Sequence, residues 1–373
     1  MSAPATSNLM CRTRTRSFVF RGAPTTDVRW PRDRSQGESL RRLDECVSAL
    51  LLIAKRHSAD PCGLRGAAGR SGERGRLGGG GYDALVSAGV APSAAPRSLV
   101  WGTDVDVLPI DRVVERRDGY LVIRSPSNPT HYWGNLLLFD DPPVAGDGAR
   151  WEEQFEREFG SDPRVQHLTL GWDHVDGAFG CAHEEFVVRG YELEQSVGLV
   201  ATPDLVRSHP RENREVQVRA LEPVVGLDEE LWEQVLALQV DARHERFDEE
   251  SYRAFSCRRT ADLRALFRLG RGAWYVALEA GSAEVVGSCG VVVTGARGRF
   301  QSVETKTAYR RRGICSRLVV EAVHRAASQH GAGHLVIAAD AKYHALGLYE
   351  SLGFQRLERV CGVCKQPARS PAG

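Results

Sequence analysis

A short basic turn at residues 310–316 constrains the fold of this chain more than any other stretch, because of the segments that flank it. Upstream, residues 287–293 and 300–305 have the composition of two strands, and downstream the apolar residues of 313–329 recur at helical spacing. The first N–H groups of a helix lack partners and its dipole favours an anion there, so arginines and a glycine at this position suit a phosphate. The sequence predicts an α/β unit with an anion site between a strand and a helix.

Length and composition limit the alternatives. The 373 residues suffice for two or three domains, and a net charge of +1 gives no overall preference for nucleic acid or an anionic membrane. The longest apolar run, residues 47–54, is too short to span a bilayer. Nine cysteines, mostly single, are typical of a reducing compartment, so we expect a cytoplasmic protein.

The first 97 residues differ from the rest. They are rich in Arg, Gly and Ser and contain twice as many basic as acidic residues. A segment with so few apolar residues cannot bury enough surface to offset its ordering entropy, so we expect a disordered extension. Two other interpretations remain open: an organellar transit peptide over the first 26 residues, or a start codon chosen too far upstream.

Two segments with globular texture follow this extension. Residues 98–213 and 214–367 each alternate strands and helices, and 368–373 form a short tail. An internal repeat relates the two segments, because 186–191 aligns without gaps with 349–354 and each stretch ends in a Gly-aromatic pair. The sequence therefore predicts two similar α/β units in tandem.

The two units differ at the predicted anion site. Where the second unit has its basic turn, the first has Asp-Asp-Pro-Pro at 140–143, which repels a phosphate and supplies few N–H donors. Phe186 takes the place of Tyr349 in the repeat and has no hydroxyl, and continuing the register places Val197 opposite Val360. We expect the first unit to lack both anion binding and catalysis.

The second unit carries two motifs of a known family. Arg310-x-x-Gly313-x-Cys315 is similar to the acyl-CoA motif Arg/Gln-x-x-Gly-x-Gly/Ala. The later signature Ala-x-x-Leu-Tyr-x-x-x-Gly-Phe is complete in Ala345, Leu348, Tyr349, Gly353 and Phe354. From about residue 216 to 366 the chain thus resembles the GNAT superfamily of acyl-CoA-dependent N-acyltransferases, in which tandem arrangements with one inactive copy are known.

This resemblance implies the GNAT fold, a mixed central sheet with flanking helices, and an enzyme that transfers acetyl from acetyl-CoA to a primary amine by direct attack, without a metal. The CoA pyrophosphate would lie over the N–H groups of 311–316, and the pantetheine would pair with 303–305 like an extra strand. Cys315 replaces a Gly or Ala of the motif, and Lys342 stands where the family often has Asn. The cofactor-binding candidates are Val303, Thr305, Arg310, Arg311, Arg312, Gly313, Ile314, Cys315, Ser316 and Lys342.

Two residues are candidates for proton transfer under this resemblance. Tyr349, past the strand that ends at Asp340, is placed to protonate the leaving thiolate as general acid. Glu304 points opposite to Val303 and Thr305 by strand alternation and is a candidate to accept the proton of the amine, directly or through water. The structural alternatives are a core tyrosine and a surface carboxylate.

Other polar clusters have both a functional and a structural interpretation. Cys361 and Cys364 have half the spacing of a zinc site, but on a strand they would point to opposite faces. In the first unit, 131–135 and 172–174 are aromatic and polar segments near strand edges. They are candidates to line a substrate cavity between the units, and ordinary core and turn residues otherwise.

The expected partner is a small-molecule or peptide amine, with neither nucleic acid nor membrane. Family membership fixes the donor and leaves the acceptor open. The second interpretation is a catalytically weak acyl-CoA-binding or sensor protein that kept the fold and lost turnover. A third is a nucleic-acid-binding protein that acts through its Arg-rich extension.

Overall fold

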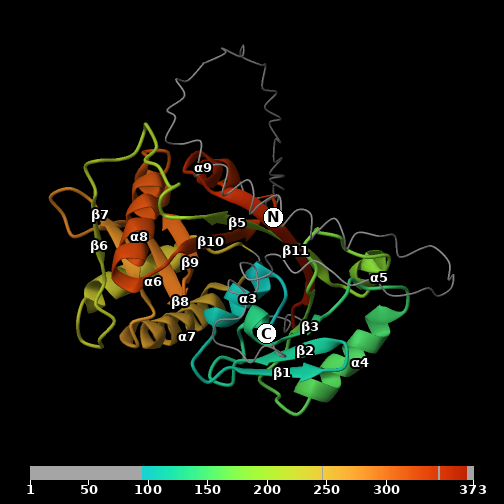
Figure 1. Ribbon diagram of the computed structural model, residues 1–373. Coiled ribbons are helices and arrows are strands. Elements are labelled where there is room, and N and C mark those ends of the chain that lie inside the picture. The colour runs from blue at the N-terminus through green and yellow to red at the C-terminus, as the bar shows by residue number, and fades with distance from the viewer. Residues whose placement is uncertain (1–94, 246, 343–344, 368–373) are drawn as a thin grey trace, which may run out of the picture. The chain divides into compact units, whose positions relative to one another are not determined.

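The computed structural model describes residues 95–245, 247–342 and 345–367 (Figure 1). All of them lie within one compact unit of the chain. The predicted extension at 1–97 therefore falls outside the described residues, apart from its last three. Within the described residues, no helix combines the length and the apolar character needed to cross a membrane.

The two halves begin differently but share the order of their later elements, three strands followed by helix, strand, helix and strand. The first half contains α3 (Leu99–Asp106), β1 (Val113–Arg117), β2 (Tyr120–Arg124), η2 (Tyr132–Gly134), β3 (Leu136–Phe139), α4 (Asp147–Phe159), β4 (Leu168–Trp172), α5 (His183–Val188) and β5 (Glu192–Ala201). The second contains β6 (Gln217–Ala220), α6 (Glu229–Asp241), α7 (Glu249–Arg268), β7 (Gly272–Leu278), β8 (Val285–Thr294), β9 (Arg297–Thr305), η3 (Thr307–Tyr309), α8 (Ile314–His330), β10 (His334–Asp340), α9 (Leu346–Ser351) and β11 (Gln355–Lys365).

The strands form one 11-stranded sheet in the order β1-β2-β3-β4-β11-β5-β10-β9-β8-β7-β6 (Figure 1). In each half an antiparallel meander ends in a parallel pair, β3 with β4 and β9 with β10. The last strand of each half then crosses to the other: β5 pairs with β10, and β11 pairs with β4. The two halves thus exchange their final strands and share one sheet.

The internal repeat is visible in the hydrogen bonds that end α5 and α9. Gly190 and Gly353 both adopt positive φ, at 86° and 107°. The N–H of the following aromatic residue then donates back to the carbonyl five residues earlier, over 2.9 Å from Tyr191 and 3.1 Å from Phe354. This is the Schellman pattern, which needs a left-handed residue where glycine is favoured. The predicted repeat is confirmed at this turn.

The register of the repeat changes by one residue inside β11. A β-bulge interrupts the pairing of β11 with β5 between Arg356 and Glu358. Beyond it, Val197 shares a face of the sheet with Cys361, and Val360 points to the opposite face. The predicted alignment of Val197 with Val360 is therefore wrong by one residue. A β-bulge inserts one extra residue into the strand, and the sequence pattern gives no sign of it.

The helices divide between the two faces of the sheet. Leu193, Val197 and Leu199 alternate onto one face of β5, where α4, α5, α8 and α9 pack. The other face carries α3 over the centre and α6 with α7 over the second half. Two ion pairs tie α3 to β9, Asp106 with Arg297 and Asp104 with Arg299, the second at 2.7 Å. The sheet therefore has one face for α8 and α9 and an opposite face shared by α3 and α7.

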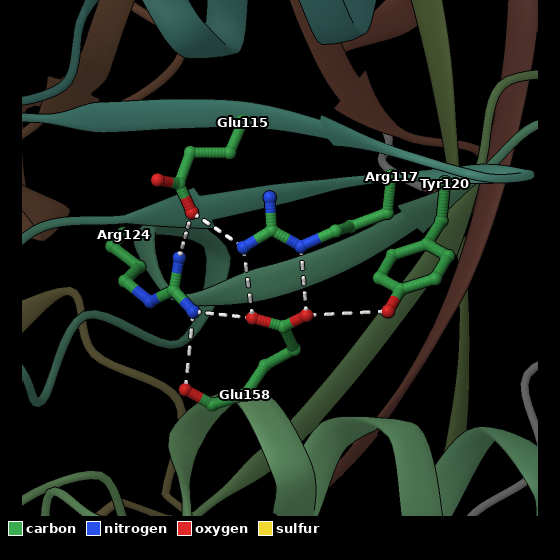
Figure 2. A network of polar contacts seen from close by, with 5 residues as sticks. All are labelled: Glu115, Arg117, Tyr120, Arg124 and Glu158. Atoms are coloured by element: carbon green, nitrogen blue, oxygen red, sulfur yellow. Dashed lines mark hydrogen bonds and ion pairs between the residues drawn. The ribbon is translucent and has the colours of Figure 1, made fainter.

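A polar network fastens the outer hairpin of the first half to α4 (Figure 2). Glu158 accepts hydrogen bonds from Arg117, Tyr120 and Arg124, over 3.0, 3.2 and 2.6 Å. Glu115 accepts from the same two arginines. Burial acts to raise the pKa of Glu158, but the hydrogen bonds from the arginines outweigh it and lower that pKa. This cluster is a structural clamp at the edge of the sheet, remote from the basic turn.

Candidate active site

The basic turn connects β9 to α8 as predicted. Gly313 is the N-cap residue of α8 and has a φ of 75°. It has no side chain that could accept a hydrogen bond from the helix start, and the first turn contains no acidic residue. The carbonyl of Gly313 accepts from Arg317, so the N–H groups of Ile314, Cys315 and Ser316 have no partner within the helix. Within the described part of the chain, the turn therefore presents unpaired donors and the positive end of a helix dipole.

Three exposed arginines surround this helix start. Nε of Arg310 donates to the carbonyl of Thr305 over 3.2 Å, which ties the turn to the end of β9. The guanidinium of Arg312 lies over the ring of Tyr309, 4.9 Å from its centroid. Arg311 adopts a left-handed φ of 62°. The positive charge of the turn is thus held near the first turn of α8.

The segment that joins the two halves passes close to Gly313. A Cβ at this position would lie 1.9 Å from the carbonyl oxygen of Arg211, and the N–H of Asn213 donates to the carbonyl of Gly313 over 3.1 Å. Glycine is required here by its positive φ and by this contact. The sequence motif alone does not predict the close contact with Arg211.

The strands beside the turn diverge. β9 and β10 pair only through Arg297–Arg299 and His334–Val336, although both continue beyond these residues. On its other side β9 has an irregular register opposite β8, and Ser302 adopts φ of 44° there. A gap between two parallel strands leaves backbone groups of 303–305 without a neighbour from β10. Such an edge can accept an extended ligand as an added strand.

Glu304 and its neighbours point to different faces, as alternation requires. Val303 packs in the cluster formed by α8 and α9. Glu304 faces α7, where its charge is the second cause, after burial, of the raised pKa of Tyr252. Oε2 of Glu304 is shielded from solvent and has no hydrogen-bond partner among the described residues. Burial raises the pKa of Glu304 to about 8, with Arg310 opposing it.

Tyr349 lies on α9 within the same cluster as Ile314 and Val303. Its side chain is 3% exposed, and its ring makes an edge contact with Phe354 at 6.4 Å. The fold thus brings Tyr349 to the side of the sheet that carries α8.

The remaining cofactor candidates differ in exposure. Burial raises the pKa of the Cys315 thiol to about 12, which favours its protonated form at neutral pH. Lys342 is exposed just past β10, and its N–H donates to Oδ1 of Asp340 over 2.7 Å.

Two cavities that share lining residues open on the face of the sheet opposite α8. The inner one has a volume of 260 Å³ and the outer one 640 Å³, and His131, Trp133 and Glu194 line both. The inner cavity is further lined by Trp101, Asp104, Val107, Leu108, Ser196, Arg259, Arg299, Gln301, Ala338, Val360, Cys361 and Gly362. The outer one is lined mainly by Tyr132, Phe247, Tyr252 and Phe255, with Arg164, His167 and Arg258.

Only part of the predicted cavity lining reaches this space. His131, Tyr132 and Trp133 line it. By contrast, Trp172 is buried in the core of the first half, and Asp173 accepts a hydrogen bond from the N–H of Ser98 over 2.8 Å. Several of the lining residues that sequence reasoning missed lie on α7. Tyr252, Phe255 and Arg259 share one face of that helix at spacings of three and four, a signal present in the sequence.

The described chain offers no metal site: among its residues no group of three or more His, Cys, Asp and Glu is suitably placed. Cys361 donates a hydrogen bond to the carbonyl of Gly177 and packs with the core of α4, whereas Cys364 lines the outer cavity. The two thiols therefore point to opposite faces of β11.

In the first half the equivalent helix start is closed. The carboxylate of Asp147, in the first turn of α4, accepts the N–H of Val144 over 2.8 Å and pairs with Arg150. Glu185 of α5 accepts the N–H of Gly146 over 3.1 Å. Phe186 is fully buried. The chain's own carboxylates thus occupy the place that an anion would need.

Comparison with known proteins agrees with this geometry. Residues 270–356 match the acetyltransferase (GNAT) domain family. Among solved structures, a functionally unknown conserved protein from Staphylococcus epidermidis has a TM-score of 0.56 at 15% identity, over 69% of this chain and 95% of that one. At this identity the match shows a shared fold alone.

Two further solved structures are less similar. A GCN5-related N-acetyltransferase from Kribbella flavida has a TM-score of 0.47 at 14% identity, over 70% of this chain and 90% of that one. A tandem GNAT protein from the clavulanic acid biosynthesis pathway has a TM-score of 0.43 at 14% identity, over 78% and 94%. No curated protein sequence matches this chain.

The matched family segment runs from just after α7 to the start of β11, so it includes the basic turn, the diverging strands and Tyr349. The predicted fold, a mixed sheet with flanking helices built from two similar units, is confirmed. Residues 270–356 thus match the GNAT acetyltransferase domain family, in the part of the chain where the sequence motifs indicated this resemblance.

Proposed function

We propose that this protein is an N-acetyltransferase that transfers the acetyl group of acetyl-CoA to a primary amine by direct attack. One observation carries the proposal: an open helix start with three arginines stands beside a strand pair that diverges after three residues. A phosphate-bearing, extended ligand is suited to both features at once. The GNAT domain match supports CoA as that ligand.

The residues present fit such a ligand. In this proposal the N–H groups of Ile314, Cys315 and Ser316, with Arg310–Arg312, hold the pyrophosphate. The free backbone edge at Val303 and Thr305 holds the pantetheine and polarises the thioester carbonyl. Lys342, exposed past the end of β10, contacts the same arm. Acetyl-CoA supplies an activated acyl group, and the protein supplies position and proton transfer.

Two side chains move protons in this proposal. Glu304 accepts a proton from the amine, directly or through a water, and its raised pKa suits this role because a base works best with a pKa near the working pH. Tyr349 donates its phenolic proton to the thiolate as the carbon–sulfur bond breaks and the carbon–nitrogen bond forms. They stand on opposite faces of the sheet, so that acceptor and leaving group are handled from different sides.

The test uses the full chain, acetyl-CoA and pooled primary amines. We expect release of free CoA thiol only when an amine is present, together with a product heavier by one acetyl group in the mass spectrum. Tight binding of acetyl-CoA without thiol release across a broad panel would favour the sensor interpretation. Absence of acetyl-CoA binding would overturn the proposal altogether.

We further propose a small-molecule or peptide amine as acceptor and the cytoplasm as location. Six cysteines in the described residues are free thiols, a state that a reducing compartment maintains.

A further inference from the structure

The inner cavity contains two arginines that no part of the proposed reaction uses. Arg259 comes from α7 and Arg299 from β9, and both line the cavity. Gln301, which lines it as well, directly precedes the irregular residue Ser302 of β9. The cavity therefore reaches the point where β9 begins to diverge from β10 and where the acyl group would lie.

Arg259 makes its side-chain hydrogen bonds to neutral acceptors. Nη1 donates to the carbonyl of Val107 over 2.6 Å, and Nη2 to Oε1 of Gln301 over 2.8 Å. Among the described residues it forms no ion pair, although Asp262 and Asp104 act on it from further away. Burial lowers the pKa of Arg259 to about 10. A partly buried cation without a paired counter-ion is costly, and an anion in the cavity would offset that cost.

Arg299 also has a hydrogen-bond donor without a partner among the described residues. Its side chain is buried, its Nη1 donates to Oγ1 of Thr103 over 2.9 Å, and its Nη2 pairs with Asp104. Its Nε is buried without any partner in the described chain. Arg299 is thus compensated by one carboxylate, while the nearby guanidinium of Arg259 is bonded to none.

The shape and charge of the site favour a carboxylate over a phosphate. A planar guanidinium matches a carboxylate with two parallel hydrogen bonds. Asp104 and Glu194 line the same inner cavity, so their negative charge opposes a dianion more than a monoanion. The adjoining outer cavity, with Tyr132, Trp133 and Phe255, suits an apolar or aromatic body.

We propose that Arg259, supported by Arg299, binds the carboxylate of a substrate, with an amino acid carrying an apolar or aromatic side chain as the expected acceptor. This inference rests on the proposed acetyl transfer. The α-amine, one carbon away from the bound carboxylate group, stays close to the diverging strands, while the side chain extends into the outer cavity. An acyl group with a terminal carboxylate is the other possible source of the same chemistry.

The first experiment compares matched substrates with the full chain. Phenylalanine is compared with phenethylamine as acceptor of acetyl-CoA, and succinyl-CoA with butyryl-CoA as donor to phenethylamine. We expect kcat/KM to be roughly 10- to 100-fold higher for the acid in the acceptor pair, the usual strength of a charge-assisted hydrogen bond. The same preference in the donor pair instead would keep the carboxylate site and reject the amino acid acceptor. Equal rates in both pairs would overturn the proposal.

The second experiment changes the arginine. Arg259→Met should remove the preference while KM for acetyl-CoA stays the same, and Arg259→Lys should restore part of it. Arg253→Met, an exposed position on the same helix, is the matched control and should behave like the parent protein. If Arg259→Met kept the preference for the acid, Arg259 would be excluded as the carboxylate-binding residue.

A binding measurement separates this inference from the proposed function. N-acetylphenylalanine and its neutral amide are titrated into the full chain, and the melting temperature is recorded. We expect a rise with the acid only, and no rise in the folded Arg259→Met variant. This readout needs no turnover, so it can succeed where acetyl transfer fails; equal shifts for acid and amide would reject the site.

Discussion

The N-termini of α4 and α8 hold equivalent places in the two halves and carry opposite chemistry. Each begins after a glycine with positive φ, 89° at Gly146 and 75° at Gly313. Just before α4, the N–H groups of Val144 and Gly146 donate to the carboxylates of Asp147 and Glu185. At α8 the first turn has no acid, and three exposed arginines stand beside it.

This difference teaches that the fold provides the position of an anion site, and a few side chains decide whether it is open. Both turns join a strand to a helix on the same face of the sheet. The first half keeps the backbone and fills the site with its own negative charge. The first half also supplies β5 beside β10, and one wall of the cavities.

Separating the halves should have the largest effect. We expect the fragments 98–213 and 214–367, expressed apart, not to fold cooperatively. The sheet edge at β4 would lack β11, and the edge at β10 would lack β5, because each of these strands lies in the other fragment. Circular dichroism melts of each fragment and of the co-expressed pair check this. A sharp two-state melt of 214–367 alone would show that β11 can return to its own half, and would contradict the expectation.

Removing one hydroxyl tests which half catalyses. Tyr349→Phe should lower the acetylation rate by about 10²- to 10⁴-fold, the usual worth of a general acid, with acetyl-CoA affinity retained. Tyr191→Phe, at the Gly-aromatic pair of the first half, is the control and should leave the rate unchanged. An undiminished rate in Tyr349→Phe would exclude this tyrosine from proton transfer.

The pH dependence of Glu304 is the next test. We expect the rate to rise with pH and to level off near the raised pKa of about 8, and Glu304→Gln to lose at least about tenfold and flatten the profile. Stability should respond as well, because the folded state prefers the protonated carboxyl. Its stabilising contribution is complete below the ordinary pKa of 4.5 and is lost as the pH rises through about 8.

That stability effect has its own readout. The difference in melting temperature between the parent protein and Glu304→Gln should change between pH 5 and pH 9, in favour of the variant at high pH. A constant difference would mean that Glu304 is not desolvated in solution.

Substituting a single arginine at either helix start should have the smallest effect on acetyl-CoA binding. Arg312→Ala should weaken acetyl-CoA binding by roughly 2- to 5-fold, as expected for an exposed charge at a helix terminus. Arg150→Ala, in the first turn of α4, should have no effect, and high salt should reduce the difference between the two variants. Arg312 is a cleaner probe than Gly313, where any Cβ would strike the carbonyl of Arg211. Equal affinities of both variants for acetyl-CoA would reject the role of the turn.

Local patterns were enough to predict much of the site. The turn at 310–316, the alternation of Val303, Glu304 and Thr305, and the repeat that ends in Gly353-Phe354 are all readable within a few residues. Their physical basis is local: glycine permits a left-handed turn, strand residues alternate, and a helix start leaves N–H groups free. The lining of the inner cavity was missed because Arg259 and Arg299 are 40 positions apart in sequence and meet only through α7 and β9.

The sequence by itself determined the resemblance of the second half to the GNAT domain, the repeat and the half that carries the basic turn. The tertiary structure decided three other matters: the exchange of β5 and β11, the contact of 211–213 with Gly313, and the burial that raises the pKa of Glu304. Strand pairing is chosen by which partner edge is available in the folded chain, since β5 and β11 have the same pattern and each suits either edge. Burial, likewise, depends on every element that packs around a group, so no local stretch of sequence specifies it.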